Sequence, residues 1–173
     1  QKLYRCGALP CDVAMIQVCP PDKHGYVSLG TSVDATLAAI ECAKTVIAVV
    51  NKNVPRAWGQ AMIPMEMIDI FVEGNTPLEP AHFSEPNDVE IAIGKHCAAL
   101  IDDGACLQMG IGAIPNAVLA QLGGHKNLGV HTEMFAAGVL ELVEKGVIHG
   151  SNKGVDKGKL VSTFLMGSQK VYD

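Results

Sequence analysis

The sequence predicts an α/β fold built on open parallel sheets, and three observations support this prediction. Short apolar or β-branched runs alternate with segments that have helical spacing. Residues 12–51 read as strand, helix and strand, which is the pattern of a βαβ unit. The same alternation occurs again after a proline-rich interruption. Because βαβ units have helical crossovers, we expect parallel sheets covered by helices.

The N-terminal part contains two predicted buried strands joined by a helix. Residues 12–18 are almost continuously apolar and predict the first buried strand, and residues 26–29 predict a short strand after a turn. Residues 34–44 predict the helix, which begins with an acidic side chain where the helix dipole favours one. Residues 45–50 are apolar and β-branched, which predicts the second buried strand.

A linker separates this part from the rest of the chain. Residues 74–87 hold three prolines and few periodic apolar positions, so we expect a domain boundary there. Asn87 and Glu90 have the spacing of a capping box at the start of the next helix. The apolar positions of that helix are Val89, Ile93, Cys97, Leu100 and Ile101.

Strands and helices alternate twice beyond this helix. Pro115 fits the first turn of a helix, since its missing N–H is not needed there. The expected strands and helices are, in chain order, 105–109, 115–122, 127–131, 136–145 (closed by Gly146) and 160–166.

Composition argues against several classes of function. The chain has 173 residues and a formal net charge of −5, and its few Lys and Arg residues form no stripe, so we expect no nucleic-acid partner. No apolar run approaches the ~20 residues that cross a bilayer, so we expect no membrane partner. The six cysteines include no CxxC pair, which predicts reduced thiols in the cytoplasm and no metal site.

The segment with the most chemical information is 108–115 (QMGIGAIP), followed by 131–134 (HTEM). A glycine turn between a strand and a helix presents backbone N–H groups to an anion or a carbonyl oxygen. Glu133 follows the next predicted strand, and consecutive parallel strands end at the same edge of a sheet. We therefore expect the Glu133 carboxylate to lie beside the amides of Gly110 and Gly112.

A carboxylate beside amide donors suits acyl transfer, because the carboxylate can attack a thioester while the amides stabilise the oxyanion. Two alternatives for Glu133 stay open: a solvated charge, or the acidic residue of a dinucleotide site. Pro115 weakens the second, since it stands where the third glycine of that fingerprint belongs. We interpret His131 as structural, because a carboxylate needs no deprotonation at neutral pH.

These motifs resemble those of the acetyl-CoA hydrolase/transferase family of class I CoA-transferases, in particular members acting on 4-hydroxybutyrate or butyrate. The resemblance covers nearly the whole chain. It rests on QMGIGAIP and HTEM, and also on residues 12–30, 30–34, 54–56 and 164–168.

The resemblance implies two half-domains of the NagB/RpiA/CoA-transferase type, with residues 1–80 as the end of the first and 81–173 as the start of the second. It implies ping-pong transfer of CoA from an acyl-CoA to acetate, butyrate or 4-hydroxybutyrate. Glu133 would be the nucleophile that becomes a glutamyl-CoA thioester. The loop against CoA would consist of Gln108, Met109, Gly110, Ile111 and Gly112.

Acetyl-CoA hydrolysis is the alternative within the same chemistry, and the two differ in how well the site excludes water. CoA is a substrate here, so we expect no separate cofactor, and we expect a homo-oligomer by analogy. Family members are much longer than this chain, so we expect an internal fragment that is inactive alone. We interpret Arg56 as an ordinary surface arginine, and Lys153, Lys157 and Lys159 as a solvated loop.

Overall fold

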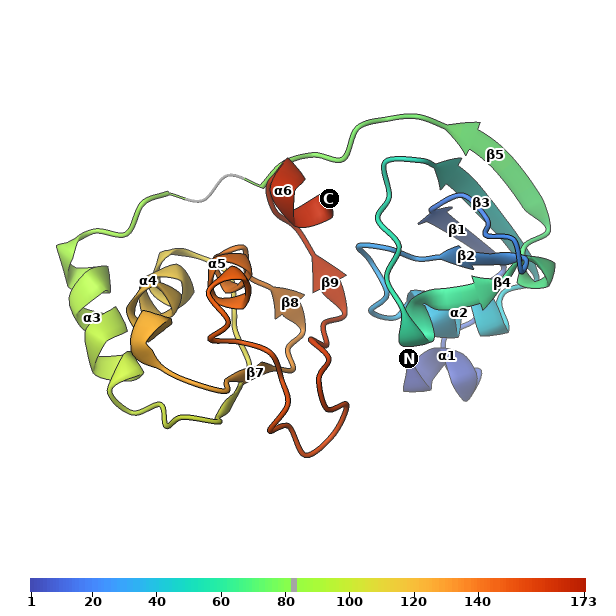
Figure 1. The fold of residues 1–173 in the computed structure, drawn as a ribbon. Coiled ribbons are helices and arrows are strands. Elements are labelled where there is room, and N and C mark those ends of the chain that lie inside the picture. Colours follow the sequence, from blue (N-terminus) through green and yellow to red (C-terminus); the bar gives the residue numbers. More distant parts are fainter. Residues whose placement is uncertain (82–83) are drawn as a thin grey trace. The chain divides into compact units, whose positions relative to one another are not determined.

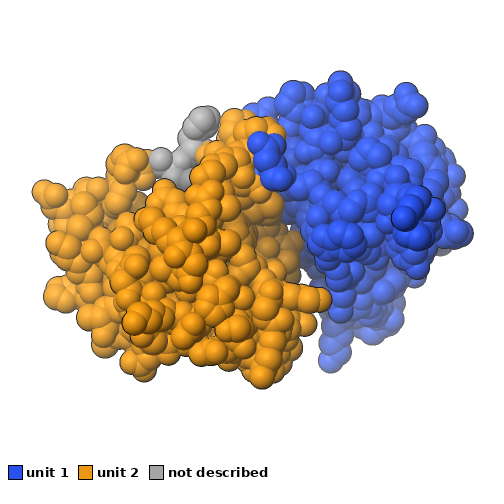
Figure 2. All heavy atoms as spheres, in the orientation of Figure 1, with its two compact units in different colours: residues 1–79, 172–173 blue, residues 80–171 orange. Residues whose placement is uncertain are grey.

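The computed structural model describes residues 1–81 and 84–173, which form two compact units (Figure 1). Unit 1 comprises residues 1–79 with 172–173, and unit 2 comprises residues 80–171 (Figure 2). Each unit has its own apolar core. The expected α/β class with parallel sheets is confirmed. The assignment of residues 1–80 and 81–173 to two family half-domains stays a prediction.

Unit 1 contains the predicted βαβ unit. Strands β1, β3 and β5 form a parallel sheet in the order β1-β3-β5, whereas β2 pairs antiparallel with β4. The elements are α1 (Lys2–Arg5), β1 (Val13–Val18), β2 (Tyr26–Ser28), α2 (Thr36–Cys42), β3 (Thr45–Asn51), β4 (Met62–Pro64) and β5 (Ile70–Gly74), with 3-10 turns at Gly59–Ala61 and Met65–Met67.

Strands β1 and β3 each pack one face into the core, the other face of β1 is exposed, and β5 at the sheet edge is exposed on both faces. Along β1, Ala14, Ile16 and Val18 are buried in the cluster that also holds Ile40 of α2. Met15, on the opposite face, is 81% exposed. The buried strand expected at residues 12–18 is therefore a strand that is buried on one face only. A run of apolar residues does not reveal which of its two faces has a packing partner.

Asp22 and Arg56 fix the turn between β1 and β2. One carboxylate oxygen of Asp22 accepts hydrogen bonds from the N–H groups of His24 and Tyr26, at 2.8 and 3.0 Å. The Arg56 guanidinium donates to the carbonyl oxygens of Pro20 and Tyr26, at 2.5 and 3.3 Å, and lies 3.6 Å from Asp22. Arg56 is thus a half-buried support of this turn rather than an ordinary surface arginine.

We expect Asp22→Asn to destabilise the protein near neutral pH and to have little effect in acid. The N–H groups of Tyr26 and His24, together with the Arg56 charge, lower the pKa of the Asp22 carboxyl. A depressed pKa means that the carboxylate stabilises the fold above the unfolded pKa of about 3.9, and that this contribution is lost as pH falls through the folded pKa.

Urea unfolding of wild type and Asp22→Asn between about pH 7 and pH 3 measures this effect. The two stabilities should converge below about pH 4. A stability difference that stays constant across that range would contradict the role given to Asp22.

Unit 2 begins at Pro80, within the predicted linker 74–87, of which residues 82–83 lie outside the described residues. Strand β6 pairs with β7 and β8 with β9, all parallel, and single bridges join Leu128 to Ile148 and His131 to Val161. The strands are shorter than expected, and β8 was not predicted. The elements are α3 (Asp88–Ala98), β6 (Cys106–Leu107), α4 (Ala113–Gln121) with a 3-10 turn at Leu122–Gly124, β7 (Gly129–Val130), β8 (Met134–Phe135), α5 (Gly138–Glu144), β9 (Phe164–Leu165) and α6 (Gln169–Tyr172).

Helix α3 begins with the predicted capping box. The Asn87 side chain accepts hydrogen bonds from the N–H groups of Val89 and Glu90, both at 3.0 Å. The Glu90 carboxylate in turn accepts one from the Asn87 N–H at 2.7 Å. Three N–H groups at the start of the helix, which have no partner within it, are thereby satisfied.

The packed face of α3 matches the expected apolar positions only in part. The helix contacts α4 through small residues: a Cβ built at Gly94 would lie 2.7 Å from the backbone of Ala117. Of the apolar positions expected for this helix, Cys97 and Ile101 pack against the unit 2 core. Val89 and Leu100 do not, and are 68% and 85% exposed. Two helix backbones can come this close only where the side chains between them are small. The spacing of apolar residues does not show which small residues lie in such a contact.

We expect Gly94→Leu to lower the free energy of unfolding, because its side chain must push α4 away from α3. Overpacking of this kind costs about 1–3 kcal/mol. Ala92→Leu is the matched control, since Ala92 is exposed on the same helix, and it should change stability by less than about 0.5 kcal/mol. Equal urea midpoints for the two variants would show that α3 and α4 do not pack this closely.

Candidate active site

The two predicted site segments leave the unit 2 sheet at the same edge. Strands β6 and β7 are parallel with Leu107 opposite Val130, and the His131 N–H donates to the Leu107 carbonyl at 2.9 Å. The loop 108–112 follows β6, and Glu133 follows β7. Both therefore lie at the carboxyl ends of adjacent strands, where open α/β folds bind ligands.

Thr132 joins these two segments through a buried hydroxyl. Its side chain is among the few buried polar groups, and the residue is 5% exposed. The Oγ1 atom accepts a hydrogen bond from the Met109 N–H at 3.0 Å and lies 2.8 Å from the Met109 carbonyl and 3.0 Å from that of Met134. Its single proton can be donated to one of these carbonyls at a time.

Sequence reasoning did not single out Thr132. The sequence pattern could have indicated it. Side chains alternate between the two faces of a strand, so Thr132, between the outward-facing His131 and Glu133, points inward.

The main chain at Glu133 is also held from the side of β9. Its carbonyl oxygen accepts hydrogen bonds from the N–H groups of Thr163 and Phe164, both at 2.9 Å, and from the Thr163 hydroxyl at 3.0 Å. His131 and Glu133 are exposed, with the buried Thr132 between them. The carboxylate is thus an accessible group on a fixed backbone, as a nucleophile requires.

The glycine loop leads directly into α4. Gly112 is the N-cap and has φ 113°, a backbone conformation that favours glycine. Pro115 lies in the first turn, as predicted. The N-cap glycine has no side chain that could cap this helix, so the N–H groups of Ala113 and Ile114 in the first turn are not bonded by a capping side chain, and Pro115 has none.

The five predicted CoA-loop residues differ in what they can offer. Met109 is 7% exposed and belongs to the unit 2 core, so it can contribute only its main chain. A Cβ at Gly112 would meet nothing within 4 Å, which leaves room for an approaching molecule. The remaining members, Gln108, Gly110 and Ile111, are exposed.

Lys153 is buried, so its placement in a solvated loop was wrong. It is 3% exposed, and its Nζ donates to the carbonyls of Val130 and Lys159 at 3.1 and 2.8 Å. Lys157 and Lys159 are exposed, as expected. A lysine in a glycine-rich run gives no local sign of burial, because the acceptors that make burial tolerable come from distant residues.

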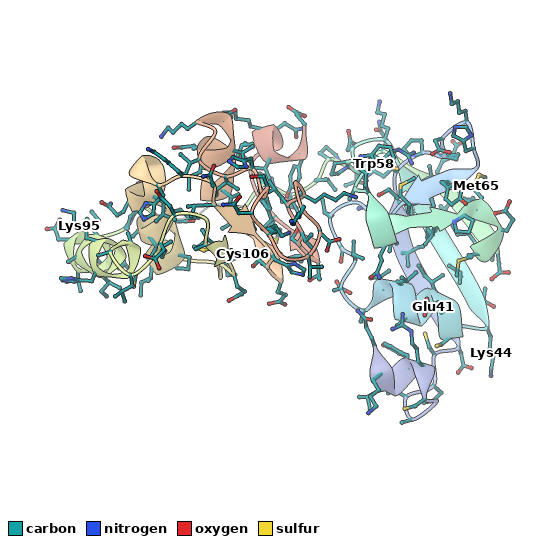
Figure 3. All side chains as sticks on the ribbon, turned by 60° about the horizontal axis from the view of Figure 1, so that its bottom comes forward. Glu41, Lys44, Trp58, Met65, Lys95 and Cys106 are labelled. Atoms are coloured by element: carbon teal, nitrogen blue, oxygen red, sulfur yellow. The ribbon has the colours of Figure 1, made fainter. Side chains whose placement is uncertain are left out.

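The described residues hold few other groups that could carry chemistry. All six cysteines are free thiols, including the exposed Cys106 in β6, labelled in Figure 3. No group of three His, Cys, Asp or Glu side chains in the described ranges could hold a metal ion. No helix there is long and apolar enough to span a membrane.

A hollow of about 490 Å³ in unit 2 is lined by α4 and α5, and one of about 230 Å³ in unit 1 lies beside β1.

Comparison with known proteins identifies relatives over nearly the whole chain. Residues 2–80 match the family model of the acetyl-CoA hydrolase/transferase N-terminal domain. The chain is 54% identical over 172 residues to a 4-hydroxybutyrate coenzyme A transferase from Clostridium kluyveri, which covers 99% of this chain and 40% of that protein. It is 38% identical over 168 residues to a butyryl-CoA:acetate CoA-transferase from Anaerostipes caccae, covering 94% of this chain and 38% of that protein.

A solved structure has the same fold. The crystal structure of a 4-hydroxybutyrate CoA-transferase from Porphyromonas gingivalis superimposes with a TM-score of 0.95 at 44% identity, over 99% of this chain and 44% of that one. The chain thus spans about two fifths of the length of the curated relatives it matches. The match to the family model, the level of identity and the shared fold agree: the chain belongs to the acetyl-CoA hydrolase/transferase family.

Proposed function

We propose that the protein containing these residues transfers CoA from an acyl-CoA to a short carboxylate of the acetate, butyrate or 4-hydroxybutyrate class. The main support is the geometry at Glu133, an exposed carboxylate on a fixed backbone at the sheet edge that also carries the loop 108–112. The names of the relatives, 4-hydroxybutyrate and butyryl-CoA:acetate CoA-transferases, support the substrate class.

The proposed reaction begins with attack of the Glu133 carboxylate on the thioester carbonyl carbon. The C–S bond breaks, CoA leaves as a thiolate, and a mixed anhydride of Glu133 remains. The thiolate then attacks the Glu133 carbonyl, the acyl group departs as a carboxylate, and a glutamyl-CoA thioester forms. An acceptor carboxylate then attacks the glutamyl-CoA thioester, and the same steps in reverse release the acceptor as its CoA thioester and regenerate the Glu133 carboxylate.

The loop 108–112 would bind CoA and stabilise the oxyanions of these steps. Backbone N–H groups placed at the developing charge are already oriented, so they need no rearrangement during the reaction. The uncapped start of α4 provides such donors beside Gly112.

Acetyl-CoA hydrolysis differs only in the last step, where water replaces the acceptor carboxylate. The family description includes both activities. CoA is a substrate in either case, so no cofactor or metal enters the scheme. A homo-oligomer and a reducing cytoplasm belong to the same proposal, and the free cysteines support the latter.

Covalent trapping tests the nucleophile. The full protein, incubated with an acyl-CoA and no acceptor and then treated with borohydride, should show a mass change on the peptide that contains Glu133. Glu133→Gln should abolish the mass change and lower kcat on the order of 10⁴-fold. Glu141→Gln, an exposed carboxylate on α5, is the control. Unmodified Glu133 in an enzyme that turns over normally would refute the assignment.

Label exchange between two acyl-CoAs separates the two activities. Exchange that depends on added acetate indicates transfer, whereas release of free CoA without an acceptor indicates hydrolysis. The trapped intermediate is the same in both cases.

Thr132→Val should lower both stability and turnover, because it removes the hydroxyl that joins Met109 to the chain before Glu133. Leaving the Met109 N–H unpaired costs about 1–3 kcal/mol in the free energy of unfolding. Thr132→Ser keeps the hydroxyl and should restore most of the activity. Urea unfolding and kcat are the measurements, and a valine variant as active as the serine variant would contradict this role.

A further inference from the structure

We propose that Lys153 is a positioning residue, which holds the end of β7 so that Glu133 is placed for attack. The proposal rests on the function proposed above. It starts from an observation that this function does not use: a lysine that is 3% exposed and donates to two main-chain carbonyls, those of Val130 and Lys159.

The first contact acts on the strand that carries the nucleophile. Val130 is the last residue of β7, three positions before Glu133, and its carbonyl accepts from the Lys153 Nζ at 3.1 Å and from the Val161 N–H at 3.2 Å. The lysine stem lies against Gly129, where an added Cβ would come within 2.6 Å of the Lys153 Cγ. Glycine at 129 therefore makes room for the stem beneath the strand.

The second contact acts on the segment that holds Glu133 from the other side. Lys153 Nζ donates to the Lys159 carbonyl at 2.8 Å. From Lys159 the chain runs past Val161, which bridges to His131, to Thr163, which donates to the Glu133 carbonyl. One ammonium group thus ties together the two chain segments between which Glu133 is fixed.

Stability alone does not account for this burial. No carboxylate among the described residues pairs with Lys153 within ion-pair distance, and burying a charge is costly unless it is compensated. An apolar side chain of similar length would fill the slot without that cost. What such a side chain lacks is the pair of donors to Val130 and Lys159.

The test compares Lys153→Met with Lys157→Met in the full protein. Lys153→Met should lower kcat and the rate of borohydride-trapped thioester formation about 10-fold or more, because small misplacements of reacting groups are costly. KM for acyl-CoA should change less than about twofold, and the urea midpoint should not fall. Lys157→Met, an exposed lysine of the same loop, should match wild type in all four measurements.

Lys153→Arg should recover part of kcat, since its guanidinium can still donate to both carbonyls. If Lys153→Met does not fold, Lys153→Leu, which also has no donor, replaces it with the same expected result. Failure of both to fold, a parallel loss of stability and kcat, or an unchanged kcat each overturns the positioning role. If wild type itself gives no trapped thioester, the proposed function fails, whereas trapping in wild type with no effect of Lys153→Met refutes the lysine proposal alone.

Discussion

The arrangement of the candidate site depends on the Thr132 hydroxyl, which joins the ends of two neighbouring strands. Its hydrogen bonds reach Met109 on the glycine loop and the carbonyl of Met134 beyond Glu133. A buried hydroxyl strongly favours conformations in which it is hydrogen-bonded, because a buried donor or acceptor without a partner costs free energy. The loop and the glutamate therefore share one rigid attachment rather than moving as two separate surface segments.

In unit 2, side-chain hydrogen bonds hold the backbone near the candidate site, a role that longer strands have in other sheets. Its strands are only two residues long, so backbone ladders alone give few bonds near the site. The Thr132 hydroxyl, the Thr163 hydroxyl and the Lys153 ammonium each bond to main-chain groups there. This arrangement keeps the backbone of the strand ends in place without long strands.

The sequence predicted those features that depend on local chemistry. The Asn87 capping box, the helix that starts at the glycine loop and the shared edge of that loop with Glu133 all follow from short-range patterns. The features it did not predict depend on distant partners. The buried face of α3 is decided by how closely α4 approaches Gly94, and the burial of Lys153 by carbonyls on Val130 and Lys159. In both cases the contacting residues are distant in the sequence, so the local pattern does not reveal them.

The exposed face of the β1-β3-β5 sheet has a practical consequence. Val13 and Met15 of β1, with Ile70 and Val72 of β5, present apolar side chains to solvent. Contiguous apolar surface promotes self-association even when a chain carries net charge. When these 173 residues are prepared on their own, colloidal behaviour will be governed by this face rather than by the formal charge of −5. Light scattering should therefore accompany every binding or spectroscopic measurement made on them.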